Sequence, residues 1–307
     1  MNASRQIRTA CLLALVAAVL AALGVGAASA ASPGGNGLLV YLQGDVGSTM
    51  PVGLMVSDGA QTREIGPRCG GEATPIAEVC PSDPVWSPDG SRLAFAQGDD
   101  LATINADGTD LRVIDLGSVR SPASPTWSPD SSELAFDAFE TAGRRELYKV
   151  LADGSAGPKR VTFKGGQSPA WSSRGTIAFV RSKNIFKLTR AGVVSRVTTR
   201  GGYQPSWGPG GRVIAFVRKA DNSLRDAPAF LYRYDVARRT ALRRLTGRPA
   251  TEPAWSPDGR SVLFTRREAG NSIIASVGAG GGDLRTVALG EEGRGRNVSS
   301  GDLQPVP

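Results

Sequence analysis

Short apolar runs alternate with turn-forming residues along most of the chain, from about residue 36 to the C-terminus. The clearest runs are Leu93–Phe95, Leu134–Phe136, Ile177–Phe179, Ile214–Phe216 and Val262–Phe264. Runs this short, bounded by Gly, Pro, Asp and Ser, are typical of β-strands. The same region has no stretch with the 3.6-residue spacing of an amphipathic helix. The pattern therefore predicts an all-β chain.

Each of these runs follows a Pro-x-Trp tripeptide, and these tripeptides contain every tryptophan of the chain. The five are Trp86, Trp127, Trp171, Trp207 and Trp255. Their spacings are 41, 44, 36 and 48 residues, and a phenylalanine follows each after eight or nine residues. Self-similarity on this scale indicates one supersecondary unit repeated along the chain. We interpret the Trp and Phe side chains as the packing core between units, because buried aromatics dominate core energetics.

A tight turn separates each tryptophan from its apolar run, and Pro88-Asp89-Gly90 is the clearest example. Proline fixes φ for the turn, the aspartate side chain hydrogen-bonds to nearby backbone groups, and glycine accepts a positive φ. The Trp-containing segment and the apolar run after it are therefore expected to form a β-hairpin. Third strands are expected at Leu101–Ile104, Leu147–Val150, Ile185–Leu188, Phe230–Tyr234 and Ile273–Ser276. Fourth strands are expected at Leu111–Ile114, Arg160–Thr162, Ser195–Thr198, Arg244–Thr246 and Leu284–Val287. Four antiparallel strands per unit, repeated around an axis, predict a β-propeller.

The N-terminal part reads as an incomplete unit. Leu39–Tyr41, Gly53–Ser57 and Thr62–Ile65 supply three strands, but no Pro-x-Trp strand precedes them. The C-terminal tail, residues 302–307, contains Gln304-Pro305, which is similar to Gln204-Pro205 at the start of a Trp strand. We expect this tail to add the missing inner strand. It would close a ring of six four-stranded blades and remove the exposed sheet edges.

The repeat resembles the TolB-type WD40-like (PD40) repeat, which is summarised as P-x-W-S-P-D-G-x-x-I/L-A-F. Residues 84–95 match that pattern, and the resemblance extends over roughly residues 36–307. Ser173-Arg174 and Pro209-Gly210 replace Pro-Asp in the fourth and fifth blades. TolB carries an additional α/β domain for which this chain leaves no room, so the resemblance implies the propeller alone. Similar repeats form the propellers of prolyl-oligopeptidase-type enzymes and of some sugar lyases.

The first thirty residues read as an export signal. Arg5 and Arg8 precede an apolar stretch, and Ala28-Ser29-Ala30 is a typical cleavage site. We therefore divide the chain into a signal peptide, residues 1–30, and a single propeller, residues 31–307. We expect an exported protein that is periplasmic, cell-surface or secreted. An uncleaved anchor helix is the alternative, because nineteen apolar residues are nearly long enough to span a bilayer, and only then is membrane contact expected.

Two cysteines, Cys69 and Cys80, remain after the predicted cleavage. An even count in an exported chain predicts one disulfide between them. The chain contains no histidine, so Ser-His-Asp catalysis, Cys-His catalysis and His-ligated zinc are excluded. Asn105–Asp110 resembles the start of a calcium loop, but the closing position holds Leu116 instead of Glu, so a hairpin turn is favoured. We expect no metal and no cofactor.

The charges are divided unevenly along the chain, whose net charge is +8. Residues 31–140 hold 5 Lys and Arg against 16 Asp and Glu, whereas residues 141–307 hold 29 against 12. Sequence order is order around a propeller, so we expect an acidic sector and a basic sector. A basic sector attracts anionic polymers, lipid head groups or acidic proteins; solvated blade edges are the alternative. Nucleic acid is not expected, because the chain reads as exported and does not interleave basic with aromatic residues.

The topology also predicts where a partner would bind. The tight turns fall on one face of the disc and the long loops on the other, and loops on a rigid scaffold usually carry recognition. The residue before each proline should surround the channel mouth on the long-loop face: Asp83, Ser124, Ser168, Gln204, Glu252 and, if the tail closes the ring, Gln304. These side chains could bind a peptide or a glycan end. Capping of blade backbone and channel water is the alternative.

Taken together, these patterns favour a monomeric, non-catalytic platform that binds an envelope protein or peptide. Two other functions stay open. One is a carbohydrate-active or hydrolytic propeller that uses carboxylates alone. The other is a binder of anionic cell-wall polymers through the basic sector.

Overall fold

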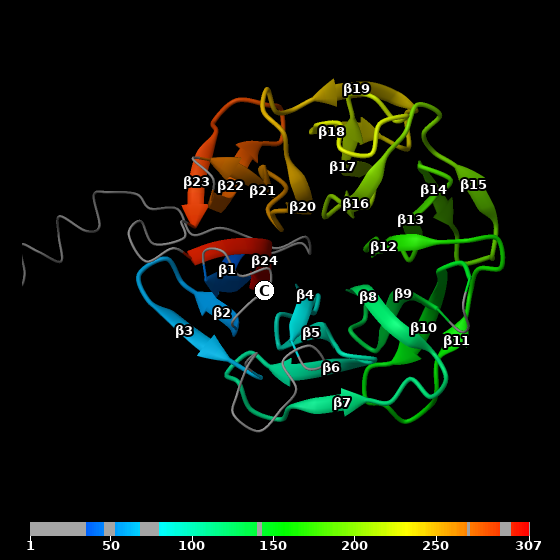
Figure 1. Ribbon diagram of the computed structural model, residues 1–307, viewed down its shortest axis with the longest axis vertical. Coiled ribbons are helices and arrows are strands. Elements are labelled where there is room, and N and C mark those ends of the chain that lie inside the picture. The colour runs from blue at the N-terminus through cyan, green and yellow to red at the C-terminus, as the bar shows by residue number, and fades with distance from the viewer. Residues whose placement is uncertain are drawn as a thin grey trace, which may run out of the picture.

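The computed structural model describes residues 35–45, 53–67, 80–139, 143–268, 271–288 and 296–306. All regular elements in these ranges are β-strands, and they form six four-stranded antiparallel sheets arranged around a central axis (Figure 1). The predicted all-β, six-bladed propeller is confirmed. The predicted export signal lies outside the described residues. Within those residues, no helix has the length and hydropathy needed to cross a bilayer.

Each blade consists of four strands that follow one another from the channel to the rim, in the order used below. Blade one contains β24 (Arg296–Val306), β1 (Gly35–Asp45), β2 (Gly53–Ser57) and β3 (Thr62–Ile65), and blade two contains β4 (Pro81–Trp86), β5 (Arg92–Gln97), β6 (Asp100–Asn105) and β7 (Arg112–Ile114). Blade three contains β8 (Arg120–Trp127), β9 (Glu133–Phe139), β10 (Glu146–Leu151) and β11 (Lys159–Arg160), and blade four contains β12 (Gln167–Trp171), β13 (Ile177–Arg181), β14 (Asn184–Leu188) and β15 (Val194–Arg196). Blade five contains β16 (Tyr203–Trp207), β17 (Val213–Lys219), β18 (Ala229–Asp235) and β19 (Thr240–Arg244), and blade six contains β20 (Thr251–Trp255), β21 (Ser261–Glu268), β22 (Asn271–Gly278) and β23 (Arg285–Ala288).

The aromatic repeat residues pack between neighbouring blades, as predicted. Trp127 of blade three lies in one apolar cluster with Ala94 and Leu101 of blade two. Phe95 and Phe136 are completely buried, and Ala94, which precedes Phe95, is buried too. Burial of each such side chain stabilises the fold by about 2–3 kcal/mol. The small alanine lets adjacent sheets approach closely enough for this packing.

The C-terminal tail closes the ring, because β24 pairs with β1 as the inner strand of blade one. The pairing of β24 with β1 places Gln304 differently from the expectation. Trp86 pairs with Leu93 in blade two, and Leu303 pairs with the equivalent Leu39 in blade one. Leu303 therefore takes the tryptophan position, where it is buried against blade six. The prediction that Gln304 occupies a ring position is wrong, since Gln304 corresponds to the serine of Trp-Ser-Pro.

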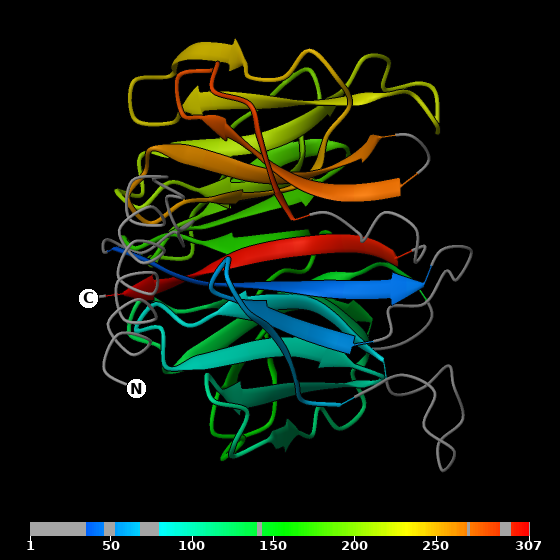
Figure 2. The same ribbon diagram turned by 90° about the vertical axis from the view of Figure 1, so that its left-hand side faces the viewer.

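The inner strands run from one face of the disc to the other. We call the face with the Trp-to-Phe turns and the third-to-fourth strand turns the turn face. The mouth face carries the second-to-third strand loops and the connections between blades. Figure 2 shows the disc from the side, with β1 and β24 pointing toward opposite faces. This geometry places the first residues of each inner strand near the mouth face.

Candidate functional site

The inner strands surround a channel with a volume of about 460 Å³. Five of the six predicted ring residues line it, and from here on they are called the mouth ring: Asp83, Ser124, Ser168, Gln204 and Glu252. Gln304 lies elsewhere. Its Oε1 accepts a hydrogen bond from the Leu38 N–H (3.1 Å), and its Nε2 donates to the Gly90 carbonyl (2.7 Å). Gln304 thus ties the closing strand to the turn face, and blade one lines the channel with Asp302.

All five mouth-ring residues adopt a left-handed backbone conformation, with φ between 47° and 52°. A register shift accompanies each of them: in blade six, Thr251 pairs with Thr265 and Ala254 pairs with Leu263, which leaves an extra residue on the inner strand. The following proline disfavours the right-handed helical region at the preceding residue. Such a bulge re-aims a side chain, and each left-handed residue costs about 1–3 kcal/mol. This left-handed backbone was not predicted from the sequence.

Two mouth-ring side chains cap the backbone of the next blade. Asp83 Oδ2 accepts a hydrogen bond from the Ser124 N–H (2.9 Å), and Gln204 Oε1 accepts one from the Glu252 N–H (3.0 Å). Between blades three and four, Ser124 is too short for this contact. There Asp137 Oδ1 accepts the Ser168 N–H (2.9 Å). The mouth ring is therefore held by hydrogen bonds between blades, which fixes the positions of its polar groups.

A second layer of the channel lies one step further inside. Asp302, Thr126 and Ser206 each accept a hydrogen bond from the N–H of the next blade's tryptophan, at 2.9, 3.1 and 3.2 Å. Burial raises the pKa of Asp302 to about 6, although the N–H groups of Trp86 and Leu303 favour its charged form. Three carboxyl side chains line the channel, those of Asp83, Glu252 and Asp302, and the described lining contains no Lys or Arg. The channel is therefore acidic.

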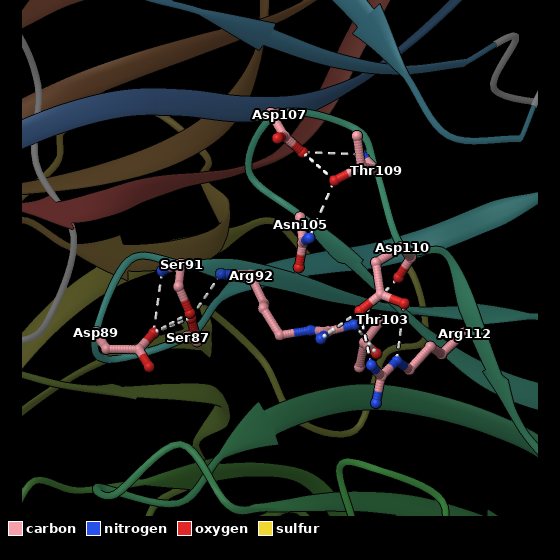
Figure 3. A network of polar contacts seen from close by, with 10 residues as sticks. All are labelled: Ser87, Asp89, Ser91, Arg92, Thr103, Asn105, Asp107, Thr109, Asp110 and Arg112. Atoms are coloured by element: carbon pink, nitrogen blue, oxygen red, sulfur yellow. Dashed lines mark hydrogen bonds and ion pairs between the residues drawn. The ribbon is translucent and has the colours of Figure 1, made fainter.

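The segment that resembles a calcium loop forms the turn between β6 and β7 (Figure 3). Asp107 Oδ1 accepts hydrogen bonds from the N–H and the hydroxyl of Thr109, at 2.9 and 2.6 Å. Asp110 forms ion pairs with Arg92 (3.0 Å) and Arg112 (2.9 Å). These bonds lower the pKa of Asp107 and of Asp110. The carboxylates are thus occupied in a hairpin turn, and the described part of the chain has no cluster of three metal-ligating side chains.

Of the two cysteines in the predicted Cys69–Cys80 disulfide, only Cys80 is among the described residues. The pairing therefore stays a prediction.

Comparison with known proteins places the chain in a family. Residues 70–227 match the model of the TolB beta propeller domain, PD40. TolB from Acinetobacter baumannii superimposes with a TM-score of 0.70 at 17% identity, over 88% of this chain and 67% of that one. A putative TolB from Agrobacterium tumefaciens gives 0.63 at 19% identity, over 89% and 100%.

A structure described as a nidogen/laminin complex gives a TM-score of 0.64 at 7% identity, over 87% of this chain and 98% of that one. Identities this low show a shared fold alone. A search of curated proteins gave no match. The family match itself covers about half of the chain, and this chain belongs to the TolB β-propeller family.

Proposed function

We propose that this chain is an exported, non-catalytic propeller that binds a protein or peptide of the cell envelope at its mouth ring. The observation that carries the proposal is a channel of about 460 Å³ whose opening is lined by polar side chains on hydrogen-bonded inner strands. Pockets of this volume commonly hold a ligand or a few side chains of a partner. Polar groups held by a rigid scaffold bind at a low entropic cost. Membership of the TolB propeller family supports the same function.

Two observations support export from the cytoplasm. The first thirty residues read as an export signal, and the structural matches include two TolB proteins. We place the protein in the periplasm, at the cell surface or outside the cell. Mass spectrometry of the protein from fractions of its native host tests this: a mature chain that begins at Ala31 supports export with cleavage, whereas an intact Met1 on protein recovered from the cytoplasm contradicts export.

The acidic lining limits what the channel can hold. The described lining contains the carboxyl groups of Asp83, Glu252 and Asp302 and no Lys or Arg. A carboxylate brought among them would be repelled, whereas an amide, a hydroxyl or an ammonium group would be accepted. The part of the partner that enters the channel is therefore uncharged or cationic.

The test is the double variant Gln204→Ala/Glu252→Ala. Crosslinking in the native envelope followed by mass spectrometry identifies partners, and binding is then measured with the purified pair. The variant should lower affinity by about tenfold or more, because two polar contacts worth about 0.5–1.5 kcal/mol each are removed. The control is Gln61→Ala/Glu133→Ala, away from the mouth ring, and it should bind as the wild type does. Unchanged binding by the Gln204/Glu252 variant removes the mouth ring from the site.

An enzymatic function remains the second candidate because of one observation: burial raises the pKa of Asp302 to about 6 inside the channel. A carboxyl group that is protonated near neutral pH can serve as a general acid. Structures described as the tricorn protease and a puromycin hydrolase share the fold, with TM-scores of 0.53 and 0.51. Turnover of a glycan or ester that Asp302→Asn abolishes would replace the binding function with this one.

A further inference from the structure

Three connections between blades share one arrangement. Each follows the pattern Arg-x-Thr-x-Lys/Arg, at residues 160–164, 196–200 and 244–248. The threonine hydroxyl accepts a hydrogen bond from the backbone N–H at the start of the third strand. These bonds are Leu147 to Thr162 (2.9 Å), Ile185 to Thr198 (2.9 Å) and Leu231 to Thr246 (3.2 Å).

The threonine bond fixes the start of each connection. The outer strands end at Arg160, Arg196 and Arg244, two residues earlier than predicted. They end there because the third-strand N–H donates to the threonine hydroxyl instead of to a backbone carbonyl of the outer strand. The cation that follows is therefore placed equivalently in three blades. We call Lys164, Arg200 and Arg248 the basic arc; all three are exposed and lie on the mouth face.

The basic arc lies close to the mouth ring. Each of its cations precedes a mouth-ring residue by four positions, and four residues span at most about 14 Å. Lys164 and Arg200 have no ion-pair partner within the described part of the chain. Arg248 pairs with Glu268 at 3.5 Å, and both are solvent-exposed, so the pair contributes little.

Two exposed apolar side chains flank the arc. Phe163, next to Lys164, is 72% exposed, with the Arg160 guanidinium 4.9 Å from its ring centre. Leu224, 59% exposed, belongs to the loop between β17 and β18 of blade five. That loop lies against blade four, because the Asn222 carbonyl accepts a hydrogen bond from Lys183 Nζ (2.9 Å) and the Asn222 amide donates one to the Arg200 carbonyl (3.1 Å). Cations and apolar groups thus share one surface.

We propose that the basic arc, with Phe163 and Leu224, binds an acidic polypeptide segment that also carries large apolar side chains. The inference rests on the proposed function, because this surface forms the outer half of the same partner site. Exposed cations attract carboxylates of the partner segment, and the acidic channel lining repels the same carboxylates, so they bind outside the channel. An anionic polymer would satisfy the cations but would leave Phe163 and Leu224 without contacts. Aromatic anchors of this kind are typical of protein interfaces.

The partner segment therefore has a defined layout. An uncharged or cationic group enters the channel, and acidic residues follow within about four positions, where the basic arc begins. The surface is screened by salt, so binding weakens as ionic strength rises.

In the experiment, a display library of short random peptides is selected for binding to the mature protein. The affinity of the enriched peptides is then measured for four forms of the protein: wild type, Lys164→Glu/Arg200→Glu, Phe163→Ser and Lys159→Glu/Arg196→Glu. The last form is the matched control, since it reverses one Lys and one Arg that are exposed on the outer strands of blades three and four. Both double variants change the net charge equally.

Enriched peptides should be acidic and contain a large apolar residue. Lys164→Glu/Arg200→Glu should weaken their binding by about tenfold or more, whereas the control should change it by less than about twofold. Phe163→Ser should weaken it several-fold. Neutral or basic peptides, or equal losses in both double variants, would overturn the proposal. Inorganic polyphosphate that binds through the arc and is insensitive to Phe163→Ser, in the absence of enriched acidic peptides, would also overturn it.

The same peptides separate this inference from the proposed function. Peptides that lose binding with Gln204→Ala/Glu252→Ala but not with the arc variant would support the mouth ring and contradict the arc. Peptides that depend on the arc alone would support the arc and contradict the mouth ring. The absence of any enriched peptide would contradict both.

Discussion

On the turn face, hydrogen bonds join the turns of blades four and five and tie the closing strand of blade one to the turn of blade two. Ser173 Oγ donates to the Pro209 carbonyl (2.7 Å), Arg174 Nε to the Gly210 carbonyl (2.8 Å), and Gln304 Nε2 to the Gly90 carbonyl (2.7 Å). On the mouth face, the described links between blades run through the mouth ring and a few loop contacts, and Lys164, Arg200 and Phe163 remain exposed. One repeat thus forms a face of short, linked turns and a face that, although its blades are also linked, leaves cations and an aromatic side chain exposed.

This difference between the two faces indicates that the repeat serves stability on the turn face and binding on the mouth face. The turn face is built from short turns of nearly uniform chemistry, and the polar groups of its Trp-to-Phe turns bond within each turn or to a neighbouring blade. The mouth face is built from loops of variable length on the same scaffold, where recognition usually resides. Substitutions on the turn face should therefore change stability, and substitutions on the mouth face should mainly change binding.

The largest expected effect is that of Gly90→Ala on the turn face. Gly90 has φ of +70°, and a methyl group there would overlap the carbonyl oxygen of Pro305 in the closing strand. We expect a loss of about 3–5 kcal/mol in the free energy of unfolding, measured by urea denaturation. Gly154→Ala is the control: φ is +74° and its surroundings are open, so it should cost only about 1–2 kcal/mol. Equal losses would show that the ring does not close through this contact.

Thr162→Val tests whether parts of the mouth face are equally structural. Thr162 accepts the Leu147 N–H and donates to Glu146 Oε2 (2.6 Å), and all three residues are buried. Valine has the same shape but leaves two buried polar groups with one bond fewer, which should cost about 2–3 kcal/mol. Thr189→Val removes a similar bond, to Val193 N–H (3.2 Å), in an exposed turn. The control should cost less than about 1 kcal/mol.

Asp302, in the channel between the two faces, should make stability depend on pH. Its pKa is about 6 in the folded state, above the ordinary value of 3.8. The folded state therefore binds more protons than the unfolded state between about pH 4 and pH 6, and stability falls as pH rises through that window. Asp302→Asn should be more stable than the wild type by about 3 kcal/mol at pH 7.5 and close to it near pH 4. A constant difference at both pH values would contradict the raised pKa.

The smallest expected effect concerns the left-handed backbone of the mouth ring. Ser168 has φ of +47°. Ser168→Val should destabilise the fold by about 1–2 kcal/mol, because a β-branched residue disfavours that conformation. Ser168→Gly should be close to neutral, since relief of strain offsets the added chain entropy. Thermal unfolding of the two variants measures the difference, and a valine variant as stable as the glycine variant would contradict the assigned backbone.

Much of the fold was predictable because its chemistry repeats. Trp86 and its four counterparts marked the inner strands, and Pro88-Asp89-Gly90 marked a hairpin. The register of the closing strand was not predicted, since that strand lacks a tryptophan. Aligning Leu303-Gln304-Pro305 with Trp86-Ser87-Pro88 would have placed Gln304 correctly.

The candidate site was predicted only in outline. Proline marked five mouth-ring residues, but no residue type announced their left-handed backbone, which arises from the bulge beside each proline. The Arg-x-Thr-x-Lys/Arg pattern was visible in the sequence at Arg160, Arg196 and Arg244. It was missed because the threonine looked like part of a strand, whereas its hydroxyl ends the strand instead.

Site-specific photo-crosslinking in the native envelope tests the central claim most directly. A photoreactive residue replaces Gln204 at the mouth ring or, as the control, the exposed Ala191 in the β14–β15 turn. The Gln204 position should crosslink to a partner protein, and the Ala191 position should give no adduct with that partner. Crosslinking of the same partner only from Ala191, or equally from both positions, would contradict a mouth-face binding site.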